Sequence, residues 1–137
     1  MKDKNTSVFV SKRNPTFFIA EIGGNHEGDF EYAKKLTDLA IKSGADAVKF
    51  QIFDPDELIS DKTLMFSYDI LLNTQTGLTE TVEEPLYDIF VRRSLSDSDW
   101  QLLKNYADSL GIIFFATIGD ELGLEVVRQT GCQSVKI

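Results

Sequence analysis

A unit of helix, glycine and buried strand repeats along this chain and restricts its possible folds more than any other feature. The unit reads SGADAVKF at residues 43–50, LGIIFFAT at residues 110–117 and TGCQSVKI at residues 130–137. Its strands are apolar almost without interruption and rich in Phe, Ile and Val, as expected for parallel strands covered on both faces. Strands that alternate with helices predict parallel crossover connections, in either a doubly wound sheet or a closed barrel.

Four strands and three helices are predicted from this pattern. The strands are expected at Phe17–Ile22, Ala47–Phe53, Ile112–Ile118 and Ser134–Ile137. The helices are expected at Asp29–Ser43, Asp97–Leu110 and Asp120–Thr130. A glycine that can end the helix follows each of them, and Ser96 and Asp99 form an S-x-x-D capping box at the start of the second.

Polar side chains stand near the carboxyl end of each predicted strand. Glu21 ends the first strand, Lys49 and Gln51 share one face of the second, Thr117 lies near the end of the third, and Lys136 lies in the fourth. Packed against covering helices, such side chains would lack polar partners. At the carboxyl-terminal mouth of a barrel they would line a site. We therefore predict the first half of a (β/α)₈ TIM barrel rather than a doubly wound sheet.

The length of the chain limits how much of a barrel it can hold. A complete barrel takes about 250 residues, whereas this chain has 137 residues and ends inside the fourth predicted strand. We therefore expect an N-terminal extension over residues 1–15 and the N-terminal half of a barrel domain over residues 16–137, truncated in strand four. This half is expected to be inactive alone and marginally stable, because its outer strands would expose unpaired edges.

The connection at residues 54–94 is much longer than the loops that usually join strands and helices. Loops of this length are mostly functional or disordered. Because this one leaves from the face where the polar side chains gather, we expect a partly ordered lid or substrate loop. Its PLYDIF segment indicates that part of it is helical, and simple disorder is the alternative.

Composition and charge exclude several classes of function. The formal net charge of −8 argues against non-specific nucleic-acid binding, because the field of the protein repels phosphate backbones. No apolar stretch is long enough to cross a membrane, and the N-terminus lacks the apolar core of a signal peptide. The single cysteine, Cys132, excludes an internal disulfide and fits a reducing cytoplasm.

The candidate site residues suggest an anionic ligand. Lys49 and Lys136 would place two point charges at one barrel mouth, which suits a phosphate or a carboxylate. Glu21 would face a polar substrate there, or it could simply cap a loop or pair with a lysine. Neutralisation of Glu21 by the two lysines in a buried network is the structural alternative, and it does not exclude ligand binding.

The loop GGNHEGD after the first strand carries two further candidates. His26 is the only histidine, and no cysteine or second histidine stands at a metal-ligand spacing from it. It therefore either serves the site or organises the loop. Asn25 either contacts a ligand or makes an Asx-type turn. Arg92 and Arg93 could serve a phosphate, although a solvated pair at a helix start is the simpler interpretation.

The segment IAEIGGNHEGDFEYAKKLTDLAIKSGADAVKFQ at residues 19–51 resembles the N-terminal part of the sialic acid synthase family. That family includes the N-acetylneuraminate, legionaminate and pseudaminate synthases. LSDSDWQLLKNYADSLGIIFFAT at residues 95–117 and the final VKI resemble the same family in register. The A-E-I-G-x-N-H-x-G-D and G-A-D-A-V-K-F-Q motifs are far more specific than general barrel patterning.

The resemblance implies an enzyme. Members of this family are (β/α)₈ barrels, usually with a small C-terminal antifreeze-like domain that reaches the partner's active site in a homodimer. They condense phosphoenolpyruvate with the open-chain aldehyde of an N-acyl hexosamine, such as N-acetylmannosamine, and release phosphate. Mn²⁺ or Mg²⁺ polarises the aldehyde. The resemblance therefore implies a cytoplasmic transferase of sialic acid biosynthesis, without a nucleic-acid or membrane partner.

The motifs carry family roles onto particular residues of this chain. Glu21 matches the family glutamate that contacts the amino sugar near the reacting aldehyde, and Gln51 matches a residue on the sugar side. Lys49 and Lys136 match lysines that bind phosphoenolpyruvate. We place Asn25 and Thr117 with the substrate-binding residues as well. The metal-ligating histidines of the family lie on later strands, so no metal ligand is expected in this sequence.

Two departures from the family pattern leave specificity open. Thr117-Ile118-Gly119 stands where many members have Thr-Pro-Phe, and residues 54–93 align poorly apart from LYDIF. The particular nonulosonic acid is therefore not predicted. The alternatives are another phosphoenolpyruvate-condensing barrel of the deoxy-octulosonate phosphate synthase type and a non-catalytic, sugar-binding half barrel.

Overall fold

The computed structural model describes residues 15–132 and 134–137. A four-stranded parallel sheet forms its centre, with the strands in the order β1-β2-β5-β6. The strands are β1 (Ile19–Gly23), β2 (Ala47–Ile52), β5 (Ile113–Ile118) and β6 (Val135–Lys136). All four predicted strands are thus confirmed, with ends that shift by one or two residues.

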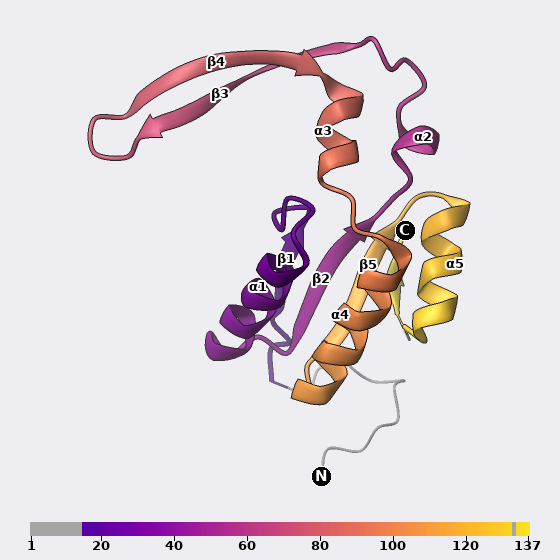
Figure 1. Ribbon diagram of the computed structural model, residues 1–137. Helices are drawn as coiled ribbons and strands as arrows, with labels where there is room; N and C mark the ends of the chain where they lie inside the picture. Colours follow the sequence, from indigo (N-terminus) through magenta and orange to yellow (C-terminus); the bar gives the residue numbers. More distant parts are fainter. Residues whose placement is uncertain (1–14, 133) are drawn as a thin grey trace.

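Three helices cover one face of this sheet, as Figure 1 shows. They are α1 (Phe30–Lys42), α4 (Asp97–Leu110) and α5 (Glu121–Thr130), and α4 contacts both of the others. Neighbouring strands follow one another along the chain with no reversal of order. A doubly wound sheet would have a reversal and helices on both faces. The arrangement is consistent with the N-terminal part of a barrel, and the preference over a doubly wound sheet is confirmed to that extent.

The hydrophobic core lies between the sheet and these helices. Phe50 is fully buried there, stacks on Phe114 at a ring-centroid distance of 5.2 Å, and meets Trp100 edge-on at 5.8 Å. The buried strand residues alternate with residues that point to the other face, as the burial pattern of β5 shows. No helix packs on that other face within the described residues, and Ile19 is 47% exposed there. One face of the sheet is thus core, and the other is open.

The helix ends follow local rules that the sequence contains. Ser96 and Asp99 form the predicted capping box at the start of α4, and Gly111 ends that helix in a left-handed conformation. Asp29 caps α1 and Asp120 caps α5, each by accepting from a backbone N–H of the first turn. In the part of the chain that the structure describes, no helix is both long and apolar enough to cross a membrane.

The long connection is ordered and leaves from the carboxyl end of β2. It contains α2 (Pro55–Leu58), an antiparallel hairpin of β3 (Met65–Asn73) and β4 (Leu78–Pro85), and α3 (Leu86–Arg92). The hairpin extends away from the body of the protein above the carboxyl ends of the strands (Figure 1). The expectation of partial helicity is confirmed, since PLYDIF lies at the start of α3. The hairpin was not predicted.

A side-chain cluster fixes the hairpin to α3. The Arg92 guanidinium donates to both carboxylate oxygens of Glu84, at 2.6 Å for the Nη1 contact, and the Tyr68 hydroxyl donates to the same carboxylate. A bidentate pair of this kind is strong and directional. Arg92 first, and then Tyr68, lowers the pKa of Glu84 from 4.5 to about 2. Arg92 therefore ends α3 and does not stand at a helix start as predicted, while its side chain is 48% exposed and pairs with Glu84.

Loss of this carboxylate is expected to loosen the hairpin. In Glu84→Gln, the ion pair with Arg92 disappears, and amide hydrogens of β3 and β4 should exchange several-fold faster, while those of the central sheet should not change. Glu83→Gln is the matched control, because Glu83 points to the opposite face of β4. In the unmodified chain, the stability that the ionised Glu84 carboxylate contributes is complete above pH 4.5 and is lost as the pH falls to about 2. Equal exchange rates in the two variants would contradict the role of the cluster.

Candidate active site

Polar side chains cross the open face of the sheet in two rows. Glu21 on β1 is in register with Lys49 on β2. Closer to the carboxyl edge, Thr117 on β5 is in register with Gln51 on β2 and with Lys136 on β6. Register partners in neighbouring parallel strands point to the same face. The sheet thus gathers five of the six predicted site residues on one surface.

Lys49 is the centre of this group. Its ammonium forms an ion pair with the Glu21 carboxylate and donates to the Thr117 hydroxyl at 2.8 Å. The Lys49 side chain is only 14% exposed, whereas the Glu21 side chain is 50% exposed. The lysine is therefore fixed between two strands, while the carboxylate still has oxygen surface open to a ligand. Glu21 therefore pairs with one lysine, Lys49, but the predicted buried network of Glu21 with both lysines is not what the described residues form, since Glu21 is half exposed.

Gln51 lies next to this pair. A Cβ atom added to Gly23 would stand 3.3 Å from Glu21 Oε1 and 3.7 Å from Gln51 Cδ, so both side chains border the same glycine. Gly23 has a φ of +58° and follows the register shift at the end of β1. Glycine takes this conformation without strain and leaves space for its two neighbours. The end of β1 thus brings Glu21 and Gln51 together.

The charge of the open face favours an anion. Lys49 and Lys136 supply two cations and Glu21 one carboxylate, so this set of residues has a net positive charge inside an acidic chain. Lys136 is exposed at the end of β6. A phosphate or carboxylate bound here would meet ammonium groups from two strands together with the Thr117 hydroxyl.

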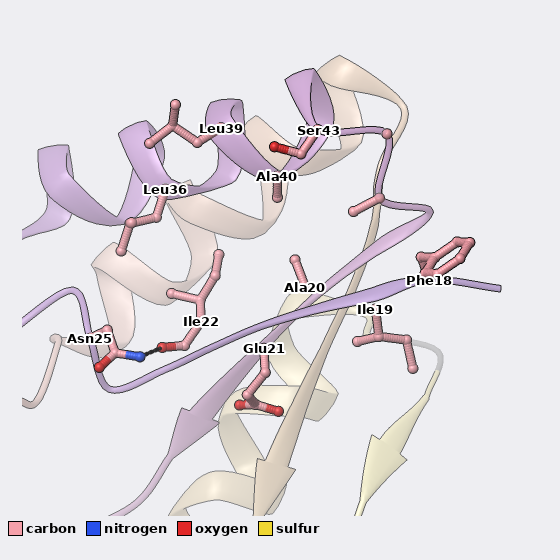
Figure 2. Close-up of a pocket in the computed structure, with 12 residues that line it drawn as sticks. Phe18, Ile19, Ala20, Glu21, Ile22, Asn25, Leu36, Leu39, Ala40 and Ser43 are labelled. Carbon is pink, nitrogen blue, oxygen red and sulfur yellow. Dashed lines mark hydrogen bonds between the residues drawn. The ribbon is translucent and has the colours of Figure 1, made fainter.

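Asn25 has a local partner. Its Nδ2 donates to the Ile22 carbonyl at 2.8 Å, and its backbone N–H donates to the same oxygen at 3.0 Å. Asn25 therefore closes the turn after β1, in agreement with the turn interpretation, and its contact with substrate stays a prediction. Figure 2 shows that Ile22 points towards α1 while Glu21 points to the other side of β1.

A cavity of about 490 Å³ lies between the edge of β1 and α1 (Figure 2). Its walls are mainly apolar and include Ile22, Leu36 and Leu39. The Glu21 carboxylate, although it borders this cavity, points away from α1 towards Lys49. We therefore separate this edge cavity from the candidate active site.

His26 lies in the core and not on the open face. It is fully buried, with its ring 6.0 Å from Phe50 and 5.6 Å from Trp100, and its Nδ1 accepts from the Gly28 N–H at 3.2 Å. That bond places the proton of the neutral ring on Nε2, which has no hydrogen-bond partner among the described residues. Burial lowers the pKa of His26 below 6.5. The structure thus supports the loop-organising role of His26.

The buried imidazole predicts an acid-sensitive fold. Because its pKa is lowered in the folded state, the unfolded chain binds the proton more readily below pH 6.5. The contribution of His26 to the free energy of unfolding should therefore be constant above that pH and should fall as the pH decreases below it. In His26→Phe, the chain has no histidine left, and the slope between pH 5 and 6.5 should flatten. Urea unfolding at several pH values measures this, and identical slopes would contradict it.

The described residues do not provide a metal centre. Among residues 15–132 and 134–137, no group of three or more His, Cys, Asp and Glu side chains is placed to hold a metal ion. Glu21 is the carboxylate of the site face, and it is already paired with Lys49. The metal that the resemblance implies does not fit a ligand set within these residues, so no step is derived through it.

A further cavity, of about 310 Å³, opens at the carboxyl ends of β2 and β5. Gln51 and Thr117 border it from the site face, Phe53 borders it just after the end of β2, and Phe90 borders it from α3. The sequence analysis placed Phe53 at the end of the second strand and Phe90 in the PLYDIF segment, and it named neither as a site residue. Gly119 also borders this cavity, and its departure from the Thr-Pro-Phe pattern of the family was the one sequence signal that pointed to this region.

Comparison with known proteins identifies the family. Residues 36–137, which are most of the chain, match the NeuB family. The chain belongs to the NeuB family. The predicted resemblance is therefore confirmed, and the two motifs that carried it lie in β1 with the loop after it and in β2 with the turn before it.

Several relatives of this NeuB family chain have assigned activities. It is 37% identical over 121 residues to the N,N'-diacetyllegionaminic acid synthase of Legionella pneumophila, with 88% of this chain and 32% of the relative covered. It is 30% identical over 129 residues to the human N-acetylneuraminate-9-phosphate synthase, with 94% and 34% covered. The chain thus spans about a third of the length of the curated relatives that it matches.

A solved structure of the family has the same arrangement. The N-acetylneuraminic acid synthetase of Leptospira borgpetersenii, crystallised in complex with citrate, superposes with a TM-score of 0.69 and 27% identity. The superposition covers 90% of this chain and 36% of that protein. The NeuB family relatives therefore support the class of a sialic-acid-type synthase, that is, a transferase of carbohydrate biosynthesis.

Proposed function

We propose that this chain is part of an enzyme that condenses phosphoenolpyruvate with an N-acylated amino sugar to form a nonulosonic acid and phosphate. Membership of the NeuB family supports the class of reaction. The observation that carries the proposal is the arrangement of Glu21, Lys49 and Thr117 on the open face. In this proposal, residues 16–137 are the N-terminal half of a barrel and are inactive alone.

The proposed roles follow from charge and position. Lys49 and Lys136 bind the anionic groups of phosphoenolpyruvate, and the Thr117 hydroxyl, which already accepts from Lys49, holds the lysine in place. Gln51 binds the sugar. Asn25 contacts substrate with the side-chain atoms that do not take part in its hydrogen bond to the Ile22 carbonyl. These assignments use the residues that the sheet brings together.

Glu21 is the proposed catalytic group. C3 of phosphoenolpyruvate attacks the aldehyde carbon, whose oxygen takes up a proton and becomes a hydroxyl. Water then adds at C2, and the tetrahedral intermediate loses phosphate by cleavage of the C2–O bond. A nearby carboxylate stabilises the positive charge that develops at C2 in the transition state. The exposed half of Glu21 can meet the reacting part of the sugar, while Lys49 fixes the position of its carboxylate.

The remaining expectations are also proposals. Mn²⁺ or Mg²⁺ would polarise the aldehyde, but its ligands would have to come from outside the residues described here. A homodimer and a cytoplasmic location stay predictions. Pairing of β1 and β6 with further strands would close the barrel and cover the open sheet face.

Phosphate release by the complete protein tests the proposal. With phosphoenolpyruvate, N-acetylmannosamine and Mn²⁺, release should require both substrates. Release with a phosphorylated sugar that has no N-acyl group, and none with N-acetylmannosamine, would indicate the deoxy-octulosonate type of reaction. If the protein binds N-acetylmannosamine but releases no phosphate with any N-acyl hexosamine tried, the enzymatic proposal is overturned in favour of a sugar-binding protein.

A further inference from the structure

Asp120 stands at a junction of three segments at the carboxyl end of the sheet. It follows β5, caps the first turn of α5 and lies beside the start of the long connection. Its side chain is partly buried there. Thr117, which belongs to the polar rows of the open face, comes shortly before it in the same strand. A contact that fixes this junction therefore also fixes the long connection relative to the candidate active site.

The two oxygens of the Asp120 carboxylate have different partners. Oδ1 accepts from the Gly123 N–H at 2.6 Å and thereby caps α5. Oδ2 accepts from the Asp54 N–H at 2.8 Å, at the start of the long connection. The cap is a contact within one helical turn, whereas the bond to Asp54 joins residues 66 positions apart. One carboxylate thus links the start of α5 to the start of the connection.

A packed contact supports the same junction. Gly123 is buried, and a Cβ atom added to it would stand 3.1 Å from the Ile52 carbonyl oxygen and 3.1 Å from Asp120 Oδ1. The first turn of α5 therefore lies directly against the end of β2. Packing and hydrogen bonding together fix Asp120 beside the residue that follows β2 and Phe53 in the chain.

The hydrogen bonds continue from Asp54 into the connection. The Asp54 carboxylate accepts from the Asp56 N–H at 2.9 Å, at the start of α2. The Asp56 carboxylate accepts from the Tyr87 hydroxyl of α3 at 3.0 Å and pairs with Lys62. A chain of polar contacts therefore runs from the end of β5 through α2 to α3. A polar network whose members all have partners holds them in one arrangement.

We propose that Asp120 is a positioning residue of the reaction, which holds the long connection in place beside the candidate active site through its bond to Asp54. The inference rests on the proposed function. In this role Asp120 touches no substrate and acts through the connection. The consequence is that loss of the bond to Asp54 should loosen α2 and α3 while the central sheet keeps its structure.

The two substrates should respond differently to this loosening. Lys49 and Lys136, which are proposed to bind phosphoenolpyruvate, stand on strands of the sheet and do not depend on the connection. Gln51, which is proposed to bind the sugar, lies at the end of β2, where the connection begins. Loss of the Asp120 contact should therefore weaken the use of the acceptor sugar more than the use of phosphoenolpyruvate.

Asp120→Asn in the complete protein separates the two contacts of the carboxylate. Its amide has one oxygen for two N–H donors, so it can cap α5 but cannot also accept from Asp54. In the phosphate-release assay, KM for N-acetylmannosamine should rise at least about fivefold, and KM for phosphoenolpyruvate should stay within about twofold. Loss of folded protein would lower kcat and leave both KM values unchanged, so the difference between the two KM values reports positioning.

Hydrogen exchange tests the link without catalysis. In Asp120→Asn, amides of α2 and α3 should exchange at least about fivefold faster, while those of the central sheet should not change. Asp29→Asn is the matched control, because Asp29 caps α1 through the Tyr32 N–H at 2.9 Å and makes no bond to the connection among the described residues. Equal exchange rates in the two variants would overturn the inference.

Asp120→Ser provides a second variant in case Asp120→Asn folds poorly. Serine is also a good N-cap, and its single oxygen, engaged with α5, leaves the Asp54 N–H without its acceptor. Phosphate release with an unchanged KM for N-acetylmannosamine in both variants would overturn the role of Asp120 alone. No release by the unmodified protein with any N-acyl hexosamine would overturn the proposed function and, with it, the role of Asp120 in the reaction.

Discussion

Lys49→Met is expected to lower the rate of phosphate release by the complete protein about 10- to 150-fold. The substitution keeps the length of the side chain but removes the ammonium that joins Glu21 to Thr117 and that is proposed to bind phosphoenolpyruvate. Hydrogen bonds to charged groups contribute about 1.5–3 kcal/mol, and 1.4 kcal/mol corresponds to a factor of ten. The loss should appear in KM for phosphoenolpyruvate as well as in kcat.

Lys34→Met provides the control for this experiment. Lys34 also forms a lysine–glutamate pair, with Glu31 at 3.0 Å, but on the outer surface of α1. Lys34 lies outside the candidate active site, and its ammonium also lies over the rings of Phe30 and Tyr106, so this variant should keep its activity. Equal activity of the Lys49 and Lys34 variants would remove Lys49 from the active site and, with it, the main support for the proposed function.

Gly28→Ala is expected to lower the free energy of unfolding by about 2–5 kcal/mol. Gly28 has a φ of +75°, and an added Cβ would stand 2.2 Å from the backbone oxygen of Arg92 and 3.3 Å from that of Ser94. The left-handed conformation costs about 1–2 kcal/mol for a residue with a Cβ. Forced insertion into a packed contact adds about 1–3 kcal/mol. The contact joins the loop after β1 to the segment between α3 and α4.

Gly24→Ala is the matched control, four residues earlier in the same loop. Its φ lies outside the left-handed region, and an added Cβ would meet nothing within 4 Å. Its effect should stay within about 0.5 kcal/mol. Denaturant unfolding of the chain measures both variants. If the two midpoints move by the same amount, the close approach of Gly28 to Arg92 does not support the fold.

Predictions based on neighbouring residues were the most accurate. The capping box at Ser96 and Asp99 and the glycine after each helix fixed the bounds of α4 and α5 to within one residue. These features depend on hydrogen bonds inside one helical turn and are therefore visible in a short stretch of sequence. Alternation along each strand likewise placed Glu21 and Lys49 on the face opposite the core.

The long connection shows where this approach failed. Its β3 and β4 are mostly exposed and carry charged residues on both faces, so the hairpin has little of the buried, alternating pattern that marks a strand. Its attachment through Arg92 and Glu84 joins residues from two different elements. This ion pair forms only when the hairpin lies beside α3, so it cannot be predicted from the sequence of either element alone.

The sequence by itself determined the order of strands and helices, the family of the chain and the residue types at the mouth of the sheet, because each depends on local periodicity or on a contiguous motif. The tertiary structure decided which of those residues meet. Lys49 reaches Thr117 across 68 positions of sequence, and His26 enters the core beside Phe50 and Trp100. Such contacts follow from strand register and helix packing, which bring distant segments together only after the chain has folded.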